Sequence, residues 1–409
     1  MRPALVVALL LCTACAPVTA PGPSPSSAPP SATPEAVKSD TPSAASPSAV
    51  AIPAPAGFTP SRPAPGIEGE VALNRWGVWW VSTDKLSVSY DGGRTWAVFP
   101  PPPGIPADSV AVTVRRDHTV WVASGQGGAV HVFRRAEGAG AWTPVDLPPR
   151  LKQDQWNSKG FSGAFAEGAD GTFGILVTAH LSMNTVESAL YTSADGGRTF
   201  ASPVRADGRM DSFGIATTPA LLSPTDAVAV TGPGMVGVAY TTDTGKTWTR
   251  SRVEGLPQGL RTDFKGLDVV DGHLELVGET VDAQAENVSY RLFESRDGGR
   301  TFQPAAAPVD GDWQRGASLG STRWIVPYAG GSVRVSADSG VTWTTVDAPS
   351  LPRGTGSVVL TSANAATAVV SAEGCETFKN NCWRRTALYA TTDGGHTWAP
   401  LPLPPGAAN

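Results

Sequence analysis

Short runs of alternating apolar and polar residues fill the chain from about residue 66 to its end, with turn residues between them. One such unit has four runs, at residues 109–114 (SVAVTV), 119–124 (TVWVAS), 129–134 (AVHVFR) and 142–145 (WTPV). A period of two residues predicts half-buried β-strands. No segment carries a sustained helical period with capping residues. The sequence therefore predicts an all-β protein built from units of four short strands.

A motif of the form S/T-x-D-x-G-x-T-W/F, called the box below, punctuates these runs. Its six copies occupy residues 89–96, 193–200, 241–248, 295–302, 336–343 and 391–398. An altered seventh copy, RAEGAGAW at residues 135–142, has Glu137 at the Asp position. The acidic residues of successive copies are 46, 58, 48, 54, 41 and 55 positions apart. A period of about fifty residues indicates a repeat array.

Each box lies between two predicted strands and is interpreted as the turn of a β-hairpin. Its carboxylate can accept hydrogen bonds from backbone N–H groups two or three residues further on, and its glycines permit positive φ. The closing Trp or Phe supplies apolar surface to bury. We therefore predict a structural role for the acidic residues Asp91, Glu137, Asp195, Asp243, Asp297, Asp338 and Asp393. One carboxylate per box makes a poor ligand set, so neither a metal site nor a cofactor is predicted.

Seven boxes with four strands each predict a seven-bladed β-propeller of four-stranded antiparallel blades over residues 66–409. This span gives roughly 49 residues per blade, within the usual range for such repeats. Radial repetition leaves only short, protected sheet edges.

The N-terminus reads as an export signal followed by a tether. Residues 1–15 combine Arg2 with an apolar core that is too short to span a bilayer. Thr-Ala-Cys at residues 13–15 resembles the end of a bacterial lipoprotein box, which predicts a lipid on Cys15 and anchorage at the cell surface. Cleavage after Ala20, with simple secretion, is the alternative. Residues 16–65 are rich in Pro, Ala, Ser and Thr, and we expect a disordered linker.

Charge and cysteine content narrow the candidate partners. The formal net charge is −5 and no basic block occurs, which argues against nucleic-acid binding. In an exported chain, Cys375 and Cys382 are most simply a disulfide that closes a short loop. We expect a monomer that reaches a membrane only through its lipid.

The standard strand order places the boxes on one face and the longest loops on the other. The predicted insertions at residues 179–187, 279–287 and 373–384 all open on that second, loop-rich face. Insertions confined to one face of a repeat protein usually mark its binding side. Cationic and aromatic residues recur there and would suit an anionic peptide or a sugar: Trp156, Lys159, Arg209, Arg261, Phe264, Lys265, Trp313, Arg315 and Arg353. The alternative is that these are ordinary solvated loop residues.

The boxes resemble those of the Asp-box propellers, also called bacterial neuraminidase repeat propellers, over residues 66–409. That group includes sialidases, xyloglucan-cleaving glycosidases, the sortilin receptor domain and the photosystem II assembly factor. The resemblance implies the fold but not an activity. In repeat number and in lacking a catalytic motif, the chain is most similar in character to the assembly factor, which implies binding through one face.

Sialidases, to which the boxes are similar, carry four further features: an Arg-Ile-Pro motif, three arginines that bind the substrate carboxylate, a Tyr nucleophile paired with a Glu, and an Asp acid. The nearest counterpart of the first is RPAP at residues 62–65, inside the predicted linker. The enzyme alternative is therefore an exo-sialidase type of glycoside hydrolase with an acid and an activated nucleophile, drawn from Tyr290, Tyr328, Glu279, Asp263 and Asp211. The expectation favoured by the sequence is a non-catalytic propeller that binds a protein or a glycan. A purely structural envelope protein is a third alternative.

Overall fold

The structure is a computed structural model. It describes residues 70–81, 85–105, 110–126, 129–148, 161–168, 170–182, 185–201, 215–232, 237–256, 261–281, 288–305, 309–310, 313–327, 329–377 and 380–405. Internal contacts divide the chain into residues 1–50 and residues 51–409, and every described residue belongs to the second unit. The predicted signal, Cys15 and the whole of the linker lie outside the described residues. In these ranges there is no helix, and hence none with the length and apolarity to cross a membrane.

The first four blades follow one another along the chain. Blade one contains β1 (Glu70–Asn74), β2 (Gly77–Val81), β3 (Leu86–Ser89) and β4 (Ala97–Phe99), and blade two contains β5 (Val110–Val114), β6 (Val120–Gln126), β7 (Ala129–Arg135) and β8 (Thr143–Val145). Blade three shows β9 (Phe161–Glu167), β10 (Phe173–Ser182) and β11 (Thr185–Ser193), and blade four contains β12 (Ile215–Leu221), β13 (Ala227–Gly232), β14 (Gly237–Thr241) and β15 (Thr249–Arg250). In blade three the Ala201 amide donates to the Thr192 carbonyl, where the fourth strand would begin.

The last three blades continue this order. Blade five contains β17 (Arg261–Val270), β18 (His273–Val281), β19 (Val288–Ser295) and β20 (Thr301–Pro304); blade six contains β22 (Trp313–Leu319), β23 (Thr322–Pro327), β24 (Gly331–Ser336) and β25 (Thr344–Ala348). Blade seven contains β26 (Thr355–Ser362), β27 (Ala365–Thr377), β28 (Asn380–Thr391) and β29 (Ala399–Pro400). Two short strands extend blade five, since β16 (Arg252–Val253) pairs with β20 and β21 (Val309–Asp310) pairs with β19.

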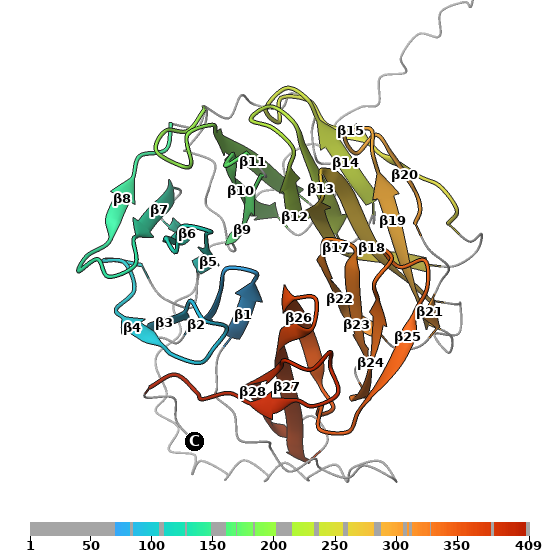
Figure 1. The fold of residues 1–409 in the computed structure, drawn as a ribbon. Coiled ribbons are helices and arrows are strands. Elements are labelled where there is room, and N and C mark those ends of the chain that lie inside the picture. The colour runs from blue at the N-terminus through green and yellow to red at the C-terminus, as the bar shows by residue number, and fades with distance from the viewer. Residues whose placement is uncertain are drawn as a thin grey trace, which may run out of the picture. The chain divides into compact units, whose positions relative to one another are not determined.

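The first strand of every blade lies innermost, and these seven strands surround a common centre (Figure 1). Each contacts the first strand of the next blade, and β1 contacts β26, which closes the ring. The strand pairs of the blades are antiparallel, apart from the added parallel pair of β16 and β20 in blade five, and each sheet is built from one continuous segment. The predicted all-β, seven-bladed propeller is confirmed.

Each intact box is held by its own side chains. In blade one, the Asp91 carboxylate accepts hydrogen bonds from the amides of Arg94 and Thr95, at 2.9 Å each, and from the Thr95 hydroxyl at 2.6 Å. The Ser89 hydroxyl donates to Asp91 and accepts from the Gly93 amide. These hydrogen bonds favour the ionised carboxylate, and the pKa values of all six box aspartates are lowered. The amides lie three and four residues after the Asp, one further than predicted.

The altered box in blade two uses its acid differently. Glu137 Oε2 lies 2.8 Å from Nδ1 of His118, a residue with φ of 57° in the neighbouring turn. The His118 ring stacks on Tyr90 of the blade-one box, with ring centroids 5.0 Å apart. The predicted turn-capping role is therefore replaced by a hydrogen bond to the turn between β5 and β6. The longer Glu side chain reaches this histidine.

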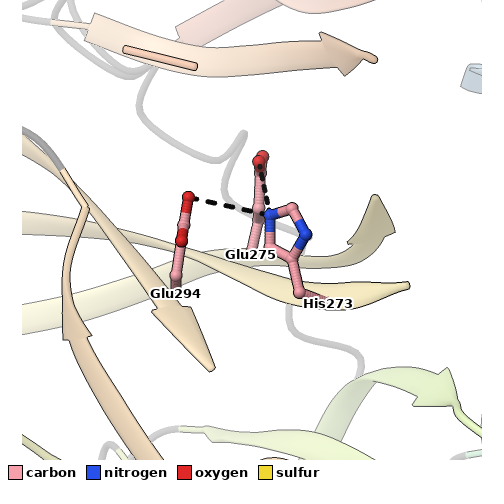
Figure 2. A group of neighbouring side chains, drawn as sticks. All are labelled: His273, Glu275 and Glu294. Atoms are coloured by element: carbon pink, nitrogen blue, oxygen red, sulfur yellow. Dashed lines mark ion pairs between the residues drawn. The ribbon is translucent and has the colours of Figure 1, made fainter. Parts of the chain in front are cut away.

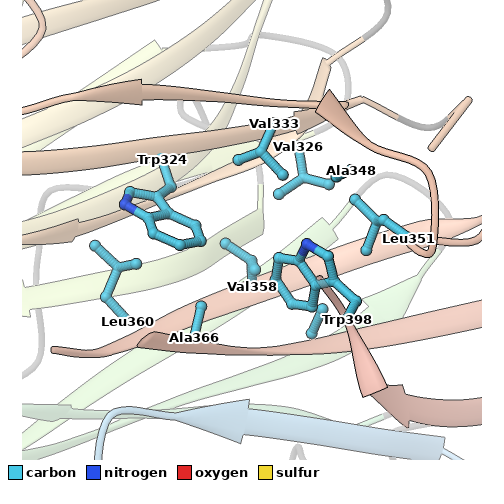
Figure 3. Packing of buried hydrophobic residues seen from close by; sticks show 10 residues of the cluster. Trp324, Val326, Val333, Ala348, Leu351, Val358, Leu360, Ala366 and Trp398 are labelled. Atoms are coloured by element: carbon cyan, nitrogen blue, oxygen red, sulfur yellow. The ribbon is translucent and has the colours of Figure 1, made fainter. Parts of the chain in front are cut away.

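The core consists of seven apolar clusters, one between each pair of adjacent blades. The cluster between blades six and seven contains ten buried residues, with Trp324 and Trp398 in a tilted edge contact at 6.3 Å (Figure 3). Among the side chains that the structure describes, the cluster between blades five and six contains three buried residues, Tyr290, Val309 and Ile325. The apolar faces of the blades therefore stabilise the ring to different extents.

Candidate functional site

A cavity of about 500 Å³ lies at the centre of the ring, and all seven blades line it. Its walls are the second halves of the inner strands, for example Leu73 and Asn74 of β1 and Leu360 of β26. The turns from first to second strands form its rim, including Arg75 and Trp76. Because adjacent strands run in opposite directions, these turns lie on the same face as the boxes. The cavity thus opens on the box face, opposite the predicted loop-rich binding face.

Two arginines lie against one tryptophan at this rim. The guanidinium carbons of Arg75 and Arg116 lie 5.2 and 5.8 Å from the centroid of the Trp76 ring. Both arginines are exposed, and within the described residues neither guanidinium forms a hydrogen bond or an ion pair. Each cation–π contact contributes about 0.5–1 kcal/mol of stabilisation at an exposed site. The rim therefore presents two adjacent positive charges with no opposing carboxylate bound to them.

The turn that carries Arg75 and Trp76 is fixed by Asn74. The Asn74 carboxamide oxygen accepts hydrogen bonds from the amides of Trp76 and Gly77, while its NH₂ group donates to the Thr113 hydroxyl and the Val114 carbonyl of blade two. A Cβ on Gly77 would overlap Val114, so blades one and two approach closely here. The rim residues therefore stand on a rigid junction between two blades.

A carboxylate faces Arg75 across the cavity. Asp268, on β17 of blade five, lines the cavity and is accessible to solvent there, while protein atoms of the surrounding wall crowd its carboxylate. Burial raises the pKa of Asp268, while the positive charges of Arg75 and Arg323 act in the opposite direction. The cavity therefore contains a carboxylic acid with a raised pKa in its wall and a cation, Arg75, at its rim.

Three other charged groups of the cavity wall, Arg115, Glu167 and Glu275, are paired between blades. Arg115 of blade two donates to Glu167 of blade three at 2.8 Å and lies over the Phe173 ring. Glu275 of blade five accepts from Arg323 and, at 2.8 Å, from the Ser318 hydroxyl of blade six. These pairs link neighbouring blades, so their side chains hold the ring together.

Of the predicted catalytic residues, Asp263, Glu279 and Tyr290 come together, and Tyr290 is buried. The register places them side by side across β17, β18 and β19. Tyr290 is 5% exposed and packs against Gly316 of blade six, in contrast to the expectation that it faces the opening. Burial raises the pKa of Tyr290 far above its usual value, which opposes a role as nucleophile. Asp211 and Tyr328 lie outside the described residues.

The predicted binding residues are only partly described. Trp156, Lys159 and Arg209 lie outside the described residues, and only the backbone is described for Arg261, Lys265, Trp313 and Arg315. Arg353 is exposed just before β26, at the loop-rich end. Phe264 differs from the prediction, because its ring packs on the core cluster between blades four and five and contacts Phe293 edge-on. Binding by the loop-rich face stays a prediction.

The two cysteines of blade seven lie directly opposite each other, with Cys375 on β27 paired with Cys382 on β28. Their side chains are outside the described set, so the disulfide stays a prediction. The sequence prediction missed the site at Arg75 and Trp76. The available signal was an Asn-Arg-Trp-Gly turn between two strands, which exposes a tryptophan next to an arginine at residues 74–77.

Comparison with known proteins gives no family. No protein-family model matches the chain, and no curated protein does. Among solved structures, YCF48 from Cyanidioschyzon merolae is 15% identical, with 74% of this chain and 87% of that chain covered and a TM-score of 0.45. YCF48 bound to D1 peptide is 14% identical (83% and 88% covered, TM-score 0.44), and the PL25 ulvan lyase bound to -[GlcA(1-4)Rha3S]- is 11% identical (83% and 96% covered, TM-score 0.43). The fold assignment rests on the strands described above, and the function has to be argued from the site.

Proposed function

We propose that this chain is a non-catalytic Asp-box propeller that binds an anionic protein segment or glycan at the rim of its central cavity. The observation that carries this proposal is the pair of guanidiniums, Arg75 and Arg116, held on the Trp76 ring without a hydrogen bond or ion pair to a carboxylate among the described residues. Guanidinium groups favour carboxylate, sulfate and phosphate as bidentate partners. The rigid turn at Asn74 means that little conformational entropy is lost on binding.

Export and anchorage belong to the same proposal. The apolar segment before Cys15 and the Pro-rich linker at residues 16–65 support a propeller held away from the membrane by a lipid anchor. An extended linker would let the box face meet ligands at the cell surface. Labelling cells with a radioactive fatty acid tests the anchor, because Cys15→Ser would abolish incorporation if Cys15 carries the lipid.

The binding proposal is tested with the full chain on arrays of acidic glycans and acidic peptides. We expect retention that falls at least about tenfold in the double variant Arg75→Gln/Arg116→Gln and weakens with salt. Arg198→Gln is the matched control, because Arg198 is an exposed box arginine of blade three with no described aromatic contact. Retention that survives the double variant, or that is lost in Arg353→Gln instead, would contradict the rim site.

A second candidate, a glycoside hydrolase, is favoured by one observation. Asp268 lines the cavity and has a raised pKa, as a general acid requires. Asp268, in place of the buried Tyr290, is then the candidate catalytic group. Release of sugar from acidic oligosaccharides by the full chain, abolished in Asp268→Asn, would establish hydrolysis. Retention without release would leave binding as the function.

A further inference from the structure

Three potential metal ligands lie together beside the central cavity. His273 begins β18, Glu275 follows two residues later on the same face of that strand, and Glu294 of β19 is paired directly opposite Glu275. Their nearest donor atoms all lie within 4.8 Å of one another (Figure 2). Two carboxylates directly opposite each other on neighbouring strands repel. Their oxygens, together with the His273 nitrogen, are candidate ligands for a cation between them.

The histidine is directed at this position without a hydrogen bond. His273 Nε2 lies 3.5 Å from Glu275 Oε1 and 3.7 Å from Glu294 Oε1. The side chain of His273 is 11% exposed, and Nε2 is buried with no hydrogen-bond partner among the described residues. A buried imidazole nitrogen without a partner is unfavourable. The two separations are too long for hydrogen bonds but near the edge, roughly 3.3–3.5 Å, of a tetrahedron of ligands at about 2.0–2.1 Å from zinc.

The surrounding residues orient the two carboxylates. Ser318 donates to Glu275 Oε2, and Arg323 donates to Glu275 Oε1, the same oxygen that lies nearest His273. Arg296 Nη2 donates to Glu294 Oε2 at 3.0 Å and leaves Oε1 toward the histidine. Ligating carboxylates commonly accept such additional hydrogen bonds. The two arginines each neutralise one glutamate, and Asp268 near Arg323 supplies further negative charge when ionised.

We propose that His273, Glu275 and Glu294 bind one divalent cation, with zinc preferred. One imidazole and two carboxylates form a nitrogen–oxygen ligand set that suits zinc better than calcium or magnesium. The burial pattern leaves one side open, because Glu294 is 19% exposed while Glu275 is 2% exposed. A water or a ligand atom would complete the coordination from that side. This site is independent of the arginine pair at the rim.

The test is zinc titration of the full chain by calorimetry after removal of metal with EDTA. We expect one equivalent of Zn²⁺ per chain, a raised midpoint of thermal unfolding, and at least about tenfold weaker binding in His273→Gln and in Glu294→Gln. His118→Gln is the matched control, because His118 also contacts a glutamate but has no third ligand. It should bind zinc as the parent chain does. Cobalt in place of zinc should give the intense visible absorption of a tetrahedral site, lost in both variants.

The opposite results are equally defined. Absence of zinc binding in the parent chain, or unchanged affinity in both variants, would overturn the proposal. A midpoint that rises at low pH in the parent chain but not in His273→Gln, with no effect of zinc, would show that a proton supplies the positive charge instead. If His273→Gln does not fold, the more exposed Glu294→Gln carries the same comparison.

Discussion

Blade six has neighbours on both sides, and its two interfaces differ in chemistry. Alternation along β23 sends Trp324 and Val326 toward blade seven, and Arg323 and Ile325 toward blade five. On one side two tryptophans pack among aliphatic residues (Figure 3). On the other, a small apolar cluster is combined with the buried pair of Arg323 and Glu275. The repeat therefore sets the position of each interface, while the residue types at the interface can be apolar or charged.

The polar interface is the one beside both the cavity and the three potential metal ligands. Glu275 lines the cavity, and Glu294 lies directly opposite it on the neighbouring strand β19. A buried ion pair adds little net stability, because desolvation offsets most of the Coulomb attraction. The physical argument therefore favours a functional reason for charge at this interface, and a stabilising reason for the tryptophans at the other.

The largest expected effect is at the apolar interface. Trp324 is 0% exposed and its side chain fills the space between blades six and seven. We expect Trp324→Ala to lower the free energy of unfolding by about 4 kcal/mol, since it removes buried surface and leaves a cavity. Urea unfolding followed by circular dichroism measures this change. Trp96→Ala, at a half-buried box tryptophan, is the control and should cost less.

The ionic interface should respond in a different way. Arg323→Met leaves the Glu275 carboxylate, which is 2% exposed, without its cation, and we expect a loss of about 3 kcal/mol. The double variant Arg323→Met/Glu275→Leu removes both charges, and its free energy of unfolding should be within about 1 kcal/mol of that of the parent chain. Both are measured in EDTA, so that bound metal does not contribute. A double variant as unstable as the single one would show that the pair itself stabilises the ring.

The hairpin turns of the boxes were predictable from the sequence, whereas the cavity was not. Each turn is held by residues close in sequence, because the Asp91 carboxylate and the Ser89 hydroxyl accept hydrogen bonds from backbone amides at most four positions away. Tyr290 was also predictable as buried, since it lies in phase with the apolar Leu292 on β19. The cavity was not predictable, because seven inner strands distant in sequence form it. Nor was the opposition of Glu275 and Glu294, which depends on the register of two strands.

A box glycine offers a sharper test of the apolar interface. Gly395 has φ of 94°, and a Cβ there would lie 3.2 Å from Cζ3 of Trp324. We expect Gly395→Ala to destabilise by about 2 kcal/mol through backbone strain and this contact. Gly394→Ala, at φ of 76° with open space around the position, separates the two causes. Equal losses in the two variants would contradict a contribution from packing on Trp324.

Acid should weaken both interfaces through the boxes, and this is the smallest effect. Hydrogen bonds from Thr342 and Ser336 lower the pKa of Asp338 to about 2 from 3.8, and similar bonds lower the pKa of Asp393. A carboxylate whose pKa is lower in the folded than in the unfolded chain stabilises the fold fully at pH values above the unfolded pKa. This stabilisation is lost as the pH falls through the folded pKa, so the free energy of unfolding should drop between about pH 4 and pH 2. Asp338→Asn and Asp393→Asn, one box from each interface, should flatten this decline in urea unfolding. Because the two boxes make the same bonds, equal flattening is expected, and a decline unaltered in both variants would contradict the box as its origin.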